Sequence, residues 1–198
     1  GREVGAGDGD GIEADLPAPL LHPLAGSWIH RRRHPEMVAL HTHLPDEAAT
    51  LALGAALAPC LEPGLIFYLT GELGAGKTTL VRGVLRGLGY AGRVKSPTYA
   101  LVELYTVSRL DLHHFDFYRF KDPREWIDAG FRETFNGRNV SLIEWPEKAG
   151  DLLPAADVEI ALASSGSGRN ASLRSSSPQG DRCLACLESH YRSTSRDT

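Results

Sequence analysis

The chain has 198 residues, of which 42% are hydrophobic and 23% are charged, and its formal net charge at pH 7 is −4. This length and composition predict one globular domain with a substantial core, and the net negative charge argues against broad, nonspecific affinity for nucleic acids. No uninterrupted apolar stretch approaches the roughly 20 residues of a membrane-spanning helix, and no signal-peptide pattern opens the sequence. We therefore expect a cytoplasmic protein.

Residues 1–36 differ in composition from the rest of the chain. Residues 1–26 are rich in Gly, Ala, Pro and acidic residues and show little periodicity, which predicts disorder. Residues 30–34 (HRRRH) form a short basic cluster that either contacts RNA or, as is usual for so short a cluster, belongs to a solvated tail. Met37 is the only methionine, and regular patterning begins just after it. Residues 1–36 are therefore predicted to be a disordered N-terminal extension.

The first regular segments alternate between strand and helix patterns. Residues 38–42 predict a strand. Residues 45–58 predict a helix, because Pro45 fits its first turn and the acidic residues Asp46 and Glu47 suit the positive end of the helix dipole. Residues 65–69 (LIFYL) are short and apolar, as is typical of a buried parallel strand. Apolar residues then recur at helical spacing over residues 80–88, before Gly89.

Between that strand and that helix lies Gly71–Thr79 (GELGAGKTT), which fits the phosphate-binding pattern G-x-x-x-x-G-K-[ST]. Glycines permit the tight turn that points backbone N–H groups at one anion. Lys77 is expected to reach the outer phosphates and the Thr78 hydroxyl to ligate Mg²⁺. The flanking strand and helix disfavour the alternative of a glycine turn without a ligand. The predicted site for ATP or GTP consists of Gly74, Ala75, Gly76, Lys77, Thr78 and Thr79.

Two carboxylates are candidates for the rest of a phosphoryl-transfer site. Residues 140–145 predict a buried strand, and Glu144 at its carboxyl end is expected to emerge beside the phosphate loop, although a strand-end acid in solvent is the alternative. Residues 110–118 predict another strand, whose alternation places His114, Asp116 and Tyr118 on one face. That face would hold metal-bound water or the nucleophile, or His114 and Asp116 would only satisfy each other on an edge strand, and spacing alone favours neither alternative.

Several further segments complete the predicted organisation. Ser96, Pro97, Thr98 and Tyr99 interrupt the pattern at a place where a mobile switch commonly lies, although alone they indicate only a turn. Residues 99–105 look extended, and residues 122–125 have a capping-box layout that predicts a helix start. Residues 157–163 and 171–175 predict strands, and a turn at 177–180 leads to a further β-segment at 182–187. Residues 188–198 are predicted to be a frayed tail.

The three cysteines are Cys60, Cys183 and Cys186. They are too few and too scattered for a disulfide framework. The last two form a C-x-x-C motif, but no second pair accompanies it and residues three apart in an extended segment face opposite sides. Structural thiols are therefore favoured over a zinc or redox site.

Taken together in this order, the motifs resemble the TsaE (YjeE) family, bacterial P-loop ATPases of tRNA threonylcarbamoyladenosine biosynthesis. The resemblance rests on residues 71–79, 94–99 with 101–103, 114–119 and 143–146, and it extends over residues 37–187. Glu72 departs from the pattern, in which Asp is common, but keeps the charge. We therefore expect an α/β fold, a P-loop NTPase-like three-layer sandwich with a mostly parallel central sheet, antiparallel strands and a C-terminal hairpin.

The resemblance also implies an activity and partners. Proteins of this family bind ATP with Mg²⁺, hydrolyse it weakly alone, and drive or reset a TsaB–TsaD complex that modifies an adenosine of tRNA. On this sequence, Gly74–Thr79 would hold the phosphates, Thr78 and Glu144 the metal, and Asp116 would lie by the reacting phosphate. Ser96–Tyr99 would be the switch-like segment, and Trp145 would pack near the site. Contact with tRNA would be indirect, through the complex, and a homodimer is compatible with the sequence.

Two other functions compete with a regulatory ATPase. One is a small-molecule kinase that uses Asp116 as a base, and the other is a nucleotide-binding module without turnover. A kinase usually needs a lid that brings several arginines over the phosphates. No arginine-dense insertion lies between Thr79 and Glu144, which disfavours the kinase.

Overall fold

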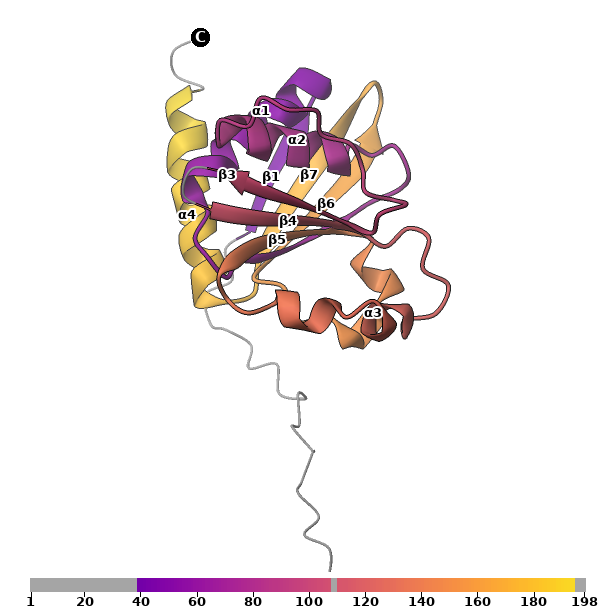
Figure 1. Ribbon diagram of the computed structural model, residues 1–198. Coiled ribbons are helices and arrows are strands. Elements are labelled where there is room, and N and C mark those ends of the chain that lie inside the picture. The colour runs from indigo at the N-terminus through magenta and orange to yellow at the C-terminus, as the bar shows by residue number, and fades with distance from the viewer. Residues whose placement is uncertain (1–38, 108–109, 195–198) are drawn as a thin grey trace, which may run out of the picture. The chain divides into compact units, whose positions relative to one another are not determined.

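The computed structural model describes residues 39–107 and 110–194 (Figure 1). The predictions made for residues 1–36, for Met37 and for residues 195–198 lie outside this part of the chain. A seven-stranded sheet has the order β1-β7-β6-β2-β5-β4-β3. Its strands are β1 (Ala39–Leu44), β2 (Ile66–Thr70), β3 (Val102–Val107), β4 (Leu110–Asp116), β5 (Asn139–Glu144), β6 (Val158–Ser165) and β7 (Gly168–Ser175).

The four central strands are parallel. β2 pairs with β5 and with β6, and β4 pairs with β5, all in parallel. β3 pairs with β4, and β7 pairs with both β6 and β1, all in antiparallel fashion. Strand β5 is buried at every position, as strands covered on both faces must be. The predicted mixed sheet, with its parallel centre and its β6–β7 hairpin, is confirmed.

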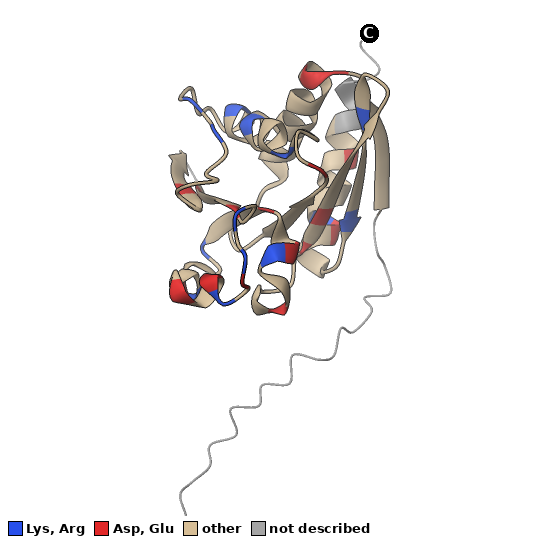
Figure 2. Cartoon of the chain, turned by 90° about the vertical axis from the view of Figure 1, so that its right-hand side faces the viewer, with Lys and Arg blue, Asp and Glu red and all other residues tan. Residues whose placement is uncertain are grey.

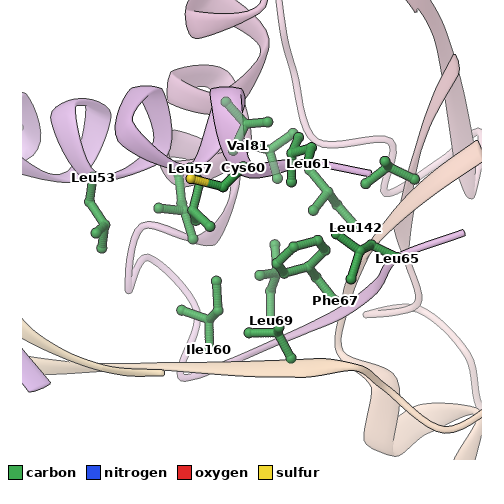
Figure 3. Packing of buried hydrophobic residues seen from close by; sticks show 14 of the residues in the cluster. Leu53, Leu57, Cys60, Leu61, Leu65, Phe67, Leu69, Val81, Leu142 and Ile160 are labelled. Carbon is green, nitrogen blue, oxygen red and sulfur yellow. The ribbon is translucent and has the colours of Figure 1, made fainter. Parts of the chain in front are cut away.

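Helices α1 (Glu47–Leu57), α2 (Lys77–Gly87) and α4 (Pro178–Thr194) and the 3₁₀ turn η1 (Ala58–Cys60) pack on one face of the sheet. Asp46 caps α1, because its Oδ1 accepts a hydrogen bond of 2.7 Å from the backbone N–H of Ala49. Strand alternation sends Phe67 and Leu69 of β2 into this core. Figure 3 shows both side chains facing Leu53, Leu57, Cys60, Leu61 and Val81 of the helical layer, with Leu142 and Ile160 beside them on the neighbouring strands.

The opposite face of the sheet carries an aromatic core. Short helical turns cover it: α3 (Glu125–Asp128), η2 (Phe131–Thr134), η3 (Pro146–Lys148) and η4 (Gly150–Leu152). Trp126 is 1% exposed and contacts the rings of Phe115, Phe117, Phe131 and Phe135. Helical elements therefore cover both faces, and the predicted three-layer sandwich is confirmed.

The C-terminal prediction is wrong after β7. Residues 178–194 form helix α4, and neither the β-segment at 182–187 nor a tail that starts at residue 188 is present. Ser177 begins the helix, because its Oγ accepts a hydrogen bond of 3.0 Å from the N–H of Gly180, and Pro178 is the first helical residue. A Ser-Pro pair fits a helix N-terminus as well as a turn, so the pair alone does not distinguish the two. The helix is favoured because its apolar face packs against α1 in the core.

The prediction for the cysteines is wrong for two of the three. Cys60 at the end of η1 forms a disulfide with Cys186 of α4, although 126 positions separate them. Only Cys183 is a free, buried thiol, as predicted. No helix within the described residues is both long and apolar enough to cross a membrane.

Close packing of α1 on α2 predicts a large effect of a small substitution. A Cβ atom on Gly54 would lie 2.3 Å from the carbonyl oxygen of Leu80 and 2.8 Å from the backbone nitrogen of Val84. Gly54→Ala is therefore expected to lower the free energy of unfolding by about 1–3 kcal/mol, which chemical denaturation measures. Ala52→Leu, on the exposed side of α1, is the control and should leave the free energy of unfolding unchanged.

Candidate active site

The candidate site lies where β2, β4 and β5 end. Gly71 follows β2 directly, and in the sheet register Glu144 of β5 is level with both Leu69 of β2 and Asp116 of β4. Because these strands are parallel, their carboxyl ends meet at one edge of the sheet. The phosphate-loop sequence and the two predicted carboxylates are thus brought together.

The backbone of the loop has conformations that require glycine. Gly71, Gly74 and Gly76 have φ angles of +134°, +81° and +104°, a region that residues with a Cβ rarely adopt. At Gly71, a Cβ would also lie 2.2 Å from the carbonyl oxygen of Leu162. Gly76 is the N-cap of α2, so the unpaired N–H groups and the positive dipole end of that helix lie at the loop. Thr79 lies in the first turn of the same helix.

Lys77 is the buried cation of the loop, with 4% of its surface exposed. Its Nζ donates hydrogen bonds of 2.6 Å to the carbonyl oxygen of Gly71 and 2.9 Å to that of Glu72. The ammonium also lies 4.1 Å from the ring centroid of Trp145. Burial lowers the pKa of Lys77, and the nearby carboxylates, Glu144 first, oppose that change.

Glu144 joins the phosphate loop to β4. Its Oε1 accepts one hydrogen bond of 2.7 Å from the Thr78 hydroxyl and lies 2.8 Å from Nε2 of His114. Glu144 is 3% exposed, so the alternative of a strand-end acid in solvent is wrong. His114 is fully buried, and its Nδ1 has no hydrogen-bond partner among the described residues. An Nε2–H tautomer therefore satisfies the carboxylate and orients it.

Asp116 is held by the segment that the sequence marks as switch-like. Its Oδ2 accepts hydrogen bonds from the Ser96 hydroxyl and from the Thr98 hydroxyl, the latter at 2.7 Å, and its Oδ1 accepts from the Tyr118 N–H at 2.9 Å. Asp116 is 2% exposed. Because His114 contacts Glu144 and not Asp116, the alternative in which these two residues only satisfy each other is wrong.

At the far end of segment 96–99, Tyr99 turns outward, whereas Pro97 is buried. The Pro97 carbonyl accepts a hydrogen bond of 2.6 Å from the N–H of Leu101, which has a positive φ of 68°. Tyr99 is 84% exposed, and the guanidinium of Arg119 lies 4.2 Å from its ring centroid. The segment thus has one end on a buried carboxylate and the other in solvent.

Trp145 follows Glu144 in an unusual backbone conformation. Its φ is 58°, in the left-handed region that bulky residues seldom adopt. Its ring packs against Tyr118, with 5.0 Å between ring centroids, as well as against the Lys77 ammonium. The structure therefore places Trp145 at the site, where it covers one side of Lys77.

Arg169 at the start of β7 is a site residue that sequence reasoning missed. Its Nη1 lies 3.4 Å from the carbonyl oxygen of Ala75, and a Cβ on Gly76 would meet the same nitrogen at 2.2 Å. The guanidinium is thus a second cation beside the phosphate loop. No local pattern marks Arg169, because its position depends on the β6–β7 hairpin folding against β2.

The donor atoms of the site fit a triphosphate with Mg²⁺. A hydroxyl and a carboxylate oxygen, from Thr78 and Glu144, are the hard ligands that Mg²⁺ takes in proteins. Glycine backbone, a helix N-terminus and the buried Lys77 are the groups that bind phosphate oxygens.

Comparison with known proteins identifies the family that has this arrangement. A family model described as "Threonylcarbamoyl adenosine biosynthesis protein TsaE" matches residues 44–171, which include every element of the site. The chain belongs to the TsaE family. The resemblance seen in its motifs is therefore confirmed.

Individual relatives extend the match. The chain is 40% identical over 156 residues to the tRNA threonylcarbamoyladenosine biosynthesis protein TsaE of Haemophilus influenzae, an alignment that covers 76% of this chain and 99% of that protein. It is 39% identical over 123 residues to TsaE of Bacillus subtilis, covering 62% of this chain and 75% of that one. The crystal structure of Bacillus subtilis YdiB superposes with a TM-score of 0.65 at 27% identity, covering 78% of this chain and 96% of YdiB.

Proposed function

We propose that this TsaE-family protein binds and hydrolyses ATP, with Mg²⁺, in support of threonylcarbamoyl modification of adenosine in tRNA. The observation that carries the proposal is the 2.7 Å hydrogen bond between Thr78, which ends the phosphate loop, and Glu144, which ends a central strand. Membership of the TsaE family supports the assignment to tRNA threonylcarbamoyladenosine biosynthesis. The proposed partners are TsaB and TsaD, and tRNA is reached through them.

The residues divide the work of binding. Lys77 exchanges its bonds to the loop carbonyls for bonds to phosphate oxygens, and its burial strengthens the attraction because little water screens it. Thr78 and Glu144 would hold Mg²⁺, which would supply positive charge to neutralise the phosphates. His114 keeps the Glu144 carboxylate in place through its Nε2–H.

Asp116 is the group proposed to orient the attacking water and to accept its proton. In the present conformation both of its oxygens already accept hydrogen bonds, from Ser96, Thr98 and Tyr118. Release of segment 96–98 would therefore free Asp116 Oδ2. This coupling gives a physical reason for weak hydrolysis by the protein alone and for faster hydrolysis once a partner moves the exposed end of the segment.

Figure 2 shows Lys and Arg concentrated at the upper left, along α2 and the loop after it, and Lys and Arg mixed with Asp and Glu elsewhere over the described elements. Residues 73–102 contain no Asp or Glu and carry five basic residues, Lys77, Arg82, Arg86, Arg93 and Lys95.

Steady-state ATP hydrolysis, measured alone and with TsaB, TsaD and tRNA, tests the proposal. We expect slow hydrolysis alone and an increase of about tenfold or more with the partners, equivalent to roughly 1.4 kcal/mol in the barrier. Glu144→Gln should abolish the increase. Transfer of the phosphoryl group to an added small acceptor, or hydrolysis that the partners leave unchanged, would contradict it.

A further inference from the structure

A second cluster of metal-ligating side chains lies away from the nucleotide site, where α4 packs on η1. The Sγ atoms of Cys60 and Cys186 and a ring nitrogen of His190 all lie within 4.8 Å of one another. The two sulfurs form the disulfide, and His190 Nδ1 is 3.7 Å from Cys186 Sγ. The nucleotide chemistry proposed above uses none of these residues.

We propose that this cluster is a redox-gated Zn²⁺ site: a disulfide when oxidised, and three protein ligands for Zn²⁺ when reduced. Two thiolates and an imidazole are a ligand set that zinc prefers, and sites with three protein ligands keep a fourth position open. His190 is exposed, so that position faces solvent. Cys60, which Figure 3 shows beside Leu57 in the apolar core, is 5% exposed and holds the buried side of the cluster.

The backbone already places the ligands for such a site. Cys186 and His190 are four residues apart in α4, a spacing that puts both side chains on one face of a helix. The Cα atoms of Cys60 and Cys186 are 5.6 Å apart. To admit an ion bound at about 2.3 Å from each sulfur, the two sulfurs must rotate away from each other and His190 Nδ1 must leave the carbonyl oxygen of Cys186, which is 3.0 Å away.

The disulfide form converts to the zinc-bound form in two steps, reduction and then metal binding. A dithiol reductant gives two electrons and two protons to the Cys60–Cys186 bond, which breaks to yield two thiols, and the reductant becomes a disulfide. Zn²⁺ then displaces one proton from each thiol as the two thiolates bind it. In either form, the cluster ties α4 to the end of η1.

Cys183 provides an internal control. It lies on the same helix but is 2% exposed and outside the cluster, and burial raises the pKa of its thiol to about 12. Such a thiol stays protonated and is a poor metal ligand. Cys183→Ala should therefore leave the site intact.

The test is a titration of the full chain with Co²⁺, a spectroscopic stand-in for Zn²⁺, after reduction with a phosphine and removal of oxygen. We expect thiolate-to-Co²⁺ charge-transfer absorption that saturates at one Co²⁺ per chain and disappears when Zn²⁺ is added. Cys186→Ser should abolish this absorption, and His190→Ala should weaken binding roughly tenfold or more because one of three protein ligands is lost. Cys183→Ala should match the wild type.

The untreated, disulfide-bonded protein should give no charge-transfer absorption, and this comparison needs no variant. The proposal is overturned if the reduced wild-type protein gives none, or if Cys186→Ser and wild-type spectra agree. It is also overturned if oxidised and reduced proteins bind Co²⁺ alike through sulfur.

Discussion

Lys77→Ala should weaken ATP binding at least about 30-fold, the equivalent of about 2 kcal/mol for charge-assisted hydrogen bonds. Lys77 is the buried cation of the loop, and its ammonium now bonds the carbonyls of Gly71 and Glu72, where phosphate oxygens are proposed to replace them. Calorimetric titration with a non-hydrolysable ATP analogue measures the effect.

The matched control is Lys121→Ala, which removes the same charge from an exposed position. Binding by this variant should equal that of the wild type, and circular dichroism should show both variants folded. Unaltered affinity in folded Lys77→Ala would overturn the assignment of the phosphate site.

Asp116→Asn should separate hydrolysis from binding. We expect the rate of ATP hydrolysis in the presence of partners to fall by about 100- to 10,000-fold, as for loss of a positioned base. Affinity for ATP should change by less than about threefold, because the residue is proposed to act on the nucleophile and not on bound phosphates. An asparagine side chain keeps the shape of the site and an acceptor for the Tyr118 N–H, and its NH₂ group, in the place of Oδ2, can donate to the Ser96 and Thr98 hydroxyls but cannot accept a proton.

Asp111→Asn is the matched control on the same strand. Asp111 is exposed and contacts Thr106, so its substitution should leave both rate and affinity unchanged. Equal rates for Asp116→Asn and Asp111→Asn would show that Asp116 is a bystander and would favour a base elsewhere in the site.

The sheet centre and the main site geometry were predictable because they follow from local patterns. Short apolar strands around a glycine loop predict a parallel sheet, and a parallel sheet brings its strand ends to one edge. That rule alone places Glu144 and Asp116 beside Gly71–Thr79. Period-two alternation likewise put His114 and Asp116 on one face, although it did not reveal that they serve different partners.

Features that depend on tertiary contacts were not predictable in this way. The segment 182–187 was assigned to a strand because short apolar runs fit strand and helix alike, and packing of α4 on α1 decided the outcome. The Cys60–Cys186 bond joins residues 126 positions apart and exists only once α4 has docked. The same is true of Arg169, which a hairpin carries to the phosphate loop.

The most direct test of the proposed function measures threonylcarbamoyladenosine in tRNA after incubation with TsaB, TsaD, a threonylcarbamoyl donor, ATP and this protein. With the wild-type chain, modification should continue through repeated rounds and consume ATP as it proceeds. With Glu144→Gln it should stop early, although that variant keeps the loop and Lys77. Equal amounts of modified tRNA with the two proteins, or modification without ATP consumption, would contradict the proposal that hydrolysis at this site drives the tRNA-modifying partners.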